Sequence, residues 1–317
     1  MLYNLFYFIF RLKKQISIFI LLLCVLSIST LSNAQGRINP ALTKIVNLQV
    51  PPLISQERST SASYVVMHFF DPFPFTDRNL LQTSLVEQAI AIYVSALSEV
   101  SEKKGQESLQ SVLKKASADS VMLHKFIYSL EQIFKSNNEI EFGNAYMETV
   151  LDFGIHAPHF SGIEKKRMSE TLAKVQKNKV GSLAPNLEFV NIKGENLNLY
   201  ALKSPYILLI FTNPGCSACG DLRSALQANT KLQEMVSTQQ LCIVNVYLGE
   251  DLTQWQNYAK EYPLQWLYLR DKNQAVYTKD IYYVPAIPSA YLLDKDKKII
   301  LKDAAYPLIE QTLLKLQ

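Results

Sequence analysis

The sequence predicts a chain in two parts, a mainly α-helical half followed by an α/β half with a mixed central sheet flanked by helices. In the first half, apolar residues recur at helical spacing, as at Phe126, Ile127 and Leu130. After about residue 179, short apolar runs alternate with helical segments. A length of 317 residues with 48% hydrophobic content is enough for two packed cores.

Residues 1–34 have the features of an export signal. A basic cluster, Arg11 to Lys14, precedes the apolar run 16–26, and Ser32-Asn33-Ala34 offers small residues for cleavage before Gln35. We therefore expect an exported, periplasmic protein. The alternative is an uncleaved segment that anchors the protein in the membrane, because residues 2–10 are also apolar; any membrane contact is expected only through this segment.

Residues 35–178 are expected to form a helical domain of unknown function. Its polar residues are scattered, and its apolar residues are explained as helix-packing faces. All four histidines lie here, but His156 and His159 form only a single pair beside Pro158. A metal site needs more convergent ligands than this pair, so we expect no metal and no cofactor.

The charge balance argues against a nucleic-acid partner. The formal charge of +4 includes Arg11, Lys13 and Lys14 of the export signal, and the basic and acidic residues of the remaining chain nearly balance. Binding to a duplex requires a clustered surplus of Lys and Arg.

Residues 179–317 are expected to form the α/β domain, which begins with a linker at 180–185. The predicted elements are a hairpin at 187–199, strands at 206–211 and 241–247, helices at 216–235 and 252–262, a strand pair at 290–294 and 298–301, and a closing helix at 308–316.

The motif Cys216-Ser217-Ala218-Cys219 follows a predicted buried strand and opens a helix. A Cys-x-x-Cys motif in this position is typical of redox-active sites. Cys216 is the expected nucleophile, because the unpaired N–H groups and dipole of the helix N-terminus favour its thiolate. Cys219, one turn later, is the expected resolving thiol. Cys242 lies in an apolar run and is expected to be a buried strand residue.

A second motif, Val284 to Ser289 with prolines at 285 and 288, directly precedes the strand at 290–293. Together with the Cys-x-x-Cys motif, it resembles the thioredoxin-like superfamily, which places a cis-proline loop opposite the cysteines. The resemblance implies that Pro288 is the cis-proline and that the Ile287 backbone contacts the substrate; the alternative is an ordinary trans Pro288, as we expect for Pro285. The early hairpin is similar to that of the TlpA-like periplasmic branch.

The sequence also departs from the family pattern. The acids that assist the second cysteine in relatives would fall at Ile210 or Leu222, and neither is acidic; Gly215 stands where a Trp is usual. Asp221, placed in the first helical turn, could serve as a proton acceptor, but the interpretation that we favour is an acid that stabilises the helix N-terminus.

The sequence thus favours an exported thiol-disulfide oxidoreductase that exchanges disulfides with exported proteins. The expected direction is reduction of the substrate, if a membrane donor supplies the electrons. The alternative is a non-catalytic envelope binding protein in which the Cys216–Cys219 disulfide is structural. The missing acid and the large helical domain both favour that alternative.

Overall fold

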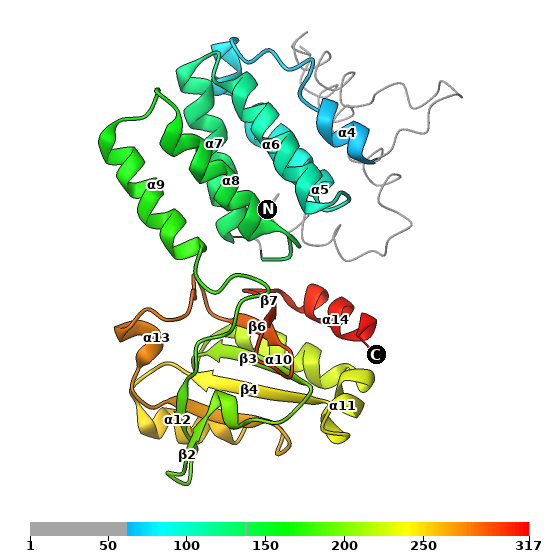
Figure 1. Ribbon diagram of the computed structural model, residues 1–317, viewed down its shortest axis with the longest axis vertical. Helices are drawn as coiled ribbons and strands as arrows, with labels where there is room; N and C mark the ends of the chain where they lie inside the picture. The colour runs from blue at the N-terminus through cyan, green and yellow to red at the C-terminus, as the bar shows by residue number, and fades with distance from the viewer. Residues whose placement is uncertain (1–61, 137, 317) are drawn as a thin grey trace, which may run out of the picture.

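The computed structural model describes residues 62–136 and 138–316, so the predicted export signal lies outside the described residues. The first half is helical, as expected, and Figure 1 shows it stacked beside the sheet-containing half. Its elements are α4 (Ala62–His68), η1 (Arg78–Gln82), α5 (Leu85–Leu97), α6 (Glu102–Ala116), α7 (Ser120–Ser136), α8 (Gly143–His156) and α9 (Gly162–Val175).

The core of the helical half forms around helix α8, which contacts α6, α7 and α9. The aromatic turn at 70–75 folds onto this core rather than forming a long element. Phe70 and Phe73 are buried there, with their ring centres 5.2 and 5.7 Å from that of Phe126 on α7. These edge-to-face contacts explain why a segment rich in Phe and Pro has little regular structure but is well packed.

The second half contains one seven-stranded mixed sheet in the order β2-β1-β5-β4-β3-β6-β7. Strands β3, β4 and β5 are mutually parallel, whereas β1 and β6 run antiparallel to their neighbours. The elements are β1 (Glu188–Val190), β2 (Asn196–Asn198), η2 (Leu199–Ala201), β3 (Tyr206–Thr212), α10 (Ser217–Ala228), α11 (Thr230–Ser237), β4 (Leu241–Tyr247), α12 (Leu252–Ala259), β5 (Leu267–Asp271), α13 (Ala275–Thr278), β6 (Ser289–Leu293), β7 (Ile299–Leu301) and α14 (Tyr306–Lys315).

The two faces of this sheet are covered differently. Helices α10, α11, α12 and α14 pack on one face, with Leu226, Met235, Trp255 and Ile309 buried there. The other face is covered by α13, η2 and the extended segment that begins near Ala184. The core strands β3 and β4 are buried on both faces, which explains their continuous apolar sequences.

Helix α10 and strand β5 differ from the sequence-based prediction. The helix expected at 216–235 is two helices, because Asn229 has an extended backbone and its side chain accepts a hydrogen bond from the Leu232 N–H as the N-cap of α11. Strand β5 was not expected, and it links the β1–β2 hairpin to β4. In the part of the chain that the structure describes, no helix has the length and apolarity needed to cross a membrane.

Candidate functional site

The two cysteines of the motif form a disulfide at the start of helix α10, with their Cα atoms 5.3 Å apart. Cys216 is the N-cap residue, and its sulfur accepts the backbone N–H of Cys219 at 3.1 Å. Such an N–H group, together with the helix dipole, stabilises negative charge on a reduced Cys216. Cys216 is half-buried, whereas Cys219 is only 2% exposed. A partner molecule can therefore reach the first sulfur but not the second.

The loop expected opposite the cysteines is found there. The peptide bond between Ile287 and Pro288 is cis, and among the described residues no other peptide bond is, so Pro285 is trans. The Ile287 carbonyl oxygen lies 3.6 Å from the Cys216 sulfur. The chain thus brings Cys216, Cys219, Ile287 and Pro288 together, although the cysteines and the loop are about seventy residues apart.

Asp221 does not occupy the position that we expected. It is the fifth residue of α10 and is exposed, and the first turn of this helix contains no acidic residue. The placement in the first turn was therefore wrong, and Asp221 lies beyond the residues whose N–H groups are free at the helix start. Ile210 is fully buried in β3 and Leu222 packs against the core, so neither position supplies a carboxyl group.

Polar side chains without carboxyl groups line the same face of the sheet. Asn245 pairs with Ile210 across β3 and β4, is 2% exposed, and its Nδ2 has no hydrogen-bond partner among the described residues. Thr212 lies beside Tyr262. Burial raises the pKa of Tyr262 to about 12, and the Thr212 hydroxyl has a smaller effect in the opposite direction. These groups can donate hydrogen bonds but cannot take a proton at neutral pH.

The backbone conformation explains why position 215 is a glycine. Its φ is +79°, in the left-handed region that residues with a Cβ disfavour. The turn Asn213–Gly215 reverses the chain between β3 and α10, and Asn213 Oδ1 accepts the Leu248 N–H at 3.3 Å. A Trp in this position would require a different backbone.

The remaining cysteine has surroundings that differ from those of the pair. Cys242 lies on β4 and packs on the face of the sheet that α13 and η2 cover. Burial raises the pKa of its thiol to about 11. It is therefore protonated at neutral pH and a poor nucleophile. Across residues 62–136 and 138–316, no three His, Cys, Asp or Glu side chains converge as metal ligands.

Two charged residues near the loop were missed at the sequence level. Lys302 and Asp303 follow β7 directly, and burial lowers the pKa of Lys302 to about 8 and raises that of Asp303 to about 7. Ser289, which follows Pro288, is the residue whose hydroxyl faces the Asp303 carboxyl. The only sequence signal is a Lys-Asp pair that ends an apolar strand, and this is a common pattern at strand ends.

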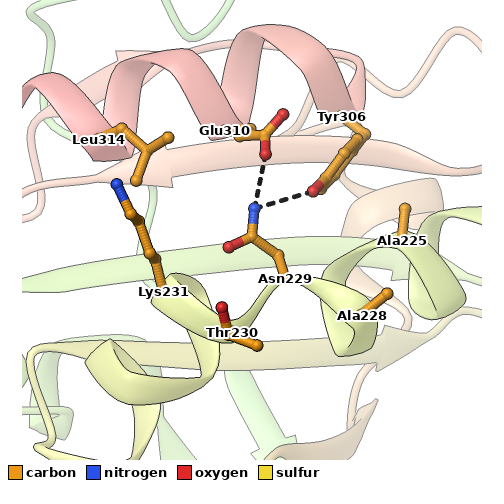
Figure 2. Close-up of a pocket in the computed structure, with 8 residues that line it drawn as sticks. All are labelled: Ala225, Ala228, Asn229, Thr230, Lys231, Tyr306, Glu310 and Leu314. Atoms are coloured by element: carbon orange, nitrogen blue, oxygen red, sulfur yellow. Dashed lines mark hydrogen bonds between the residues drawn. The ribbon is translucent and has the colours of Figure 1, made fainter.

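An open depression lies at the other end of α10, as Figure 2 shows. It is lined by Ala225 and Ala228 of α10, the start of α11, and α14. Asn229 donates to the Tyr306 hydroxyl at 3.0 Å and to Glu310 Oε1 at 2.6 Å across it. These polar groups satisfy one another, and a helix of this length separates them from the cysteines by about 18 Å.

Comparison with known proteins gives results for both halves of the chain. Residues 27–178 match a family described as a domain of unknown function, DUF5106. A thiol-disulfide oxidoreductase ResA from Bacillus cereus is 25% identical over 130 residues, or 41% of this chain and 72% of the relative. ResA from Bacillus anthracis is 24% identical over 128 residues, or 40% of this chain and 71% of the relative.

A solved structure extends the likeness to both halves. A thioredoxin-like protein from Bacteroides caccae ATCC 43185 aligns with a TM-score of 0.77 and 28% identity, covering 84% of this chain and 98% of that chain. A match of this extent includes the helical half as well as the sheet.

The mixed sheet, the Cys-x-x-Cys motif at a helix start and the cis-proline loop beside it define a protein of the thioredoxin class. The second half of the chain has a thioredoxin-like fold and is similar to thiol-disulfide oxidoreductases, and the segment that matches the DUF5106 model precedes it.

Proposed function

We propose that this chain is an exported thiol-disulfide oxidoreductase that exchanges disulfides with exported proteins in the reducing direction, using electrons from a membrane donor. The observation that carries the proposal is the position of the Cys216 sulfur. It is accessible, it lies at the N-cap of α10, and it is 3.6 Å from the Ile287 carbonyl of the cis-proline loop. Export rests on the signal-like sequence of residues 1–34.

The proposed reaction begins with the reduced protein. The Cys216 thiolate attacks one sulfur of a substrate disulfide, so that a mixed disulfide forms and the other substrate sulfur leaves as a thiolate that takes up a proton. Cys219 then loses its proton and attacks the Cys216 sulfur, which releases the second substrate thiolate. Two electrons have passed from the protein to the substrate, and a donor dithiol restores the reduced pair.

The cis-proline loop has a binding role in this proposal. An extended substrate can pair with the backbone of Ile287, in the manner of a strand added to an exposed edge, and this would place its sulfur beside Cys216. Pro288 follows Ile287 across the cis peptide bond, and the Ile287 carbonyl oxygen lies 3.6 Å from the Cys216 sulfur. Cys219 reaches the mixed disulfide from the buried side of the helix.

Proton removal from Cys219 has no buried carboxyl at position 210 or 222 to assist it. Thiolate formation would then depend on the local field of the helix and on access to solvent. This absence favours a second candidate function, that of a binding protein whose Cys216–Cys219 disulfide is structural.

The reduction potential of the Cys216–Cys219 pair, measured in graded thiol buffers with an alkylation readout, separates the two functions. A potential near the roughly −270 mV of thioredoxin supports a reductase, and one near roughly −120 mV indicates an oxidant. A potential well below about −300 mV would favour the structural disulfide.

Trapping in cells provides the second test. We expect the Cys219→Ala protein to accumulate mixed disulfides with exported proteins, because Cys216 then forms adducts that no second thiol resolves. The matched controls are the Cys216→Ala,Cys219→Ala double variant, which should form none through the motif, and Cys242→Ala, which should behave like the unaltered protein. If no adducts depend on Cys216, the exchange function is wrong.

A further inference from the structure

The segment that leads into the cis-proline loop is bound to the end of the helical half. The Lys177 ammonium forms an ion pair with Asp280 and donates to its main-chain oxygen at 2.9 Å. Asn178 makes two contacts through its side-chain amide. Its Nδ2 donates to the Ile281 oxygen at 2.8 Å, and its Oδ1 accepts the Tyr283 N–H at 2.7 Å. The linker thus holds residues 280–283 through side chains and backbone together.

Lys302 provides a second connection between this segment and the end of the helical half. Its ammonium donates to the main-chain oxygens of Val175 and Lys177, the latter at 2.6 Å, and lies 4.6 Å from the centre of the Tyr283 ring. Val175 is the last residue of α9, where carbonyl oxygens have no helical partner and the dipole favours a cation. Lys302 is 8% exposed, so it depends on these contacts to remain charged.

The residue before the loop is also bound to the strand that follows the loop. Tyr291 of β6 donates its hydroxyl to the Tyr283 oxygen, and Asp303 faces Ser289, the residue that follows Pro288. The Tyr283 side chain packs against the core of the helical half. Consequently, Lys302 contacts Tyr283, the residue immediately before the five-residue loop 284–288, and Asp303 lies near Ser289, the residue immediately after it.

We propose that Lys302 is a positioning residue that fixes the cis-proline loop against the end of the DUF5106 domain, so that the helical domain forms part of the frame of the substrate site. This inference rests on the proposed disulfide-exchange function. Protein substrates need the Ile287 backbone in place because they pair with it as extended chains, whereas a small disulfide needs only the Cys216 sulfur. Lys302 should therefore affect protein substrates selectively.

Steady-state reduction of two disulfides, insulin and a small aromatic disulfide, tests this selectivity on the full chain. In Lys302→Met, which keeps the length of the side chain and removes its charge, we expect the KM for insulin to rise about tenfold. The kcat for insulin and the rate with the small disulfide should stay within twofold of the unaltered protein. In Lys302→Arg, the KM for insulin should return most of the way to that of the unaltered protein. The matched control is Lys298→Met, because Lys298 is an exposed lysine just before β7. Equal slowing of both substrates, or an unchanged KM for insulin, would overturn the proposal.

Hydrogen exchange of the backbone amides in residues 280–288 provides a readout that does not need activity. We expect exchange in this segment to become at least tenfold faster in Lys302→Met and to be unchanged in Lys298→Met. Asn178→Gly serves as a second, milder variant, because glycine accepts the φ of +50° at this position and loses only the side-chain contacts. It should shift exchange in the same direction.

The two experiments separate failure of this inference from failure of the proposed function. If the unaltered protein does not reduce insulin, the exchange function fails, and the hydrogen-exchange comparison still decides whether Lys302 holds the loop. If exchange in residues 280–288 is the same in the unaltered protein, in Lys302→Met and in Asn178→Gly, the positioning role is wrong regardless of activity.

Discussion

Replacing Asp303 by Asn should change how the stability of this protein depends on pH. Burial raises the pKa of the Asp303 carboxyl from 3.8 to about 7, against the smaller opposing effects of Ser289 and Lys302. Between those two values the folded protein holds a proton at Asp303 that the unfolded chain has already lost. Raising the pH therefore favours unfolding, and stability is lost from about pH 4 up to the folded pKa.

The size of this effect follows from the two pKa values. A difference of one pKa unit between the folded and unfolded states corresponds to about 1.36 kcal/mol. The largest change in the free energy of unfolding that Asp303 can cause is therefore about 4 kcal/mol. The pKa of Lys302, lowered by burial to about 8 from 10.5, acts in the opposite direction but only above that pH. There the folded protein loses a proton that the unfolded chain keeps, so stability rises with pH. A comparison between pH 4.5 and 7.5 therefore isolates Asp303.

Urea unfolding of the unaltered protein and of Asp303→Asn at these two pH values measures the effect. Asn tolerates the φ of +48° at this position, so the backbone conformation is kept. The stability of the variant relative to the unaltered protein should increase between pH 4.5 and 7.5 by about 3 kcal/mol, the part of that largest change that falls in this interval. Asp296→Asn, a change at an exposed aspartate in the turn before β7, should show no such increase. A stability difference that is the same at both pH values would refute the reasoning.

Two further predictions concern the site itself. Gly215→Ala forces a Cβ into a φ of +79°, and we expect it to lower the free energy of unfolding by about 1 to 2 kcal/mol in a denaturant titration; an unchanged midpoint would contradict the strain argument. In the reduced protein at pH 8, a thiol reagent should modify Cys216 first. Cys219 is buried, and with a pKa of about 11 only about one Cys242 thiol in a thousand is deprotonated. Peptide mapping of partially alkylated protein gives the order, and earlier labelling of Cys219 than of Cys216 would contradict it.

Local patterns were sufficient to predict most of the second half. Strand β4 was expected at 241–247 and is found there, and β3 extends only one residue beyond its prediction. Both strands are buried on two faces, and this produces continuous apolar runs that are easy to recognise. Strand β5 was missed because its sequence, Leu-Tyr-Leu-Arg-Asp, mixes apolar and charged residues. Its place between β1 and β4 depends on pairing with strands far away in the sequence.

The split of the predicted helix at Asn229 has a similar origin. The apolar periodicity continues across this residue, but its side chain is held by Tyr306 and Glu310 of α14, which are nearly eighty residues away. Asn is a favourable N-cap residue, and the hydrogen bonds to α14 hold its side chain in place. Asp221 was misplaced for a simpler reason. The helix begins at Ser217, which leaves Asp221 outside its first turn.

The candidate site residues could be predicted from the sequence, because Cys-x-x-Cys at a helix start and a proline before a strand are local motifs that can be recognised without knowledge of distant residues. Which sulfur is accessible and which residues surround the cis-proline loop could be seen only once the chain was folded. Lys302 and Asp303 acquire their roles by burial against Val175, Tyr283 and Ser289. Burial depends on contacts between segments that are separate in the sequence, in the case of Lys302 and Val175 by 127 residues, and these leave no periodic pattern in the sequence.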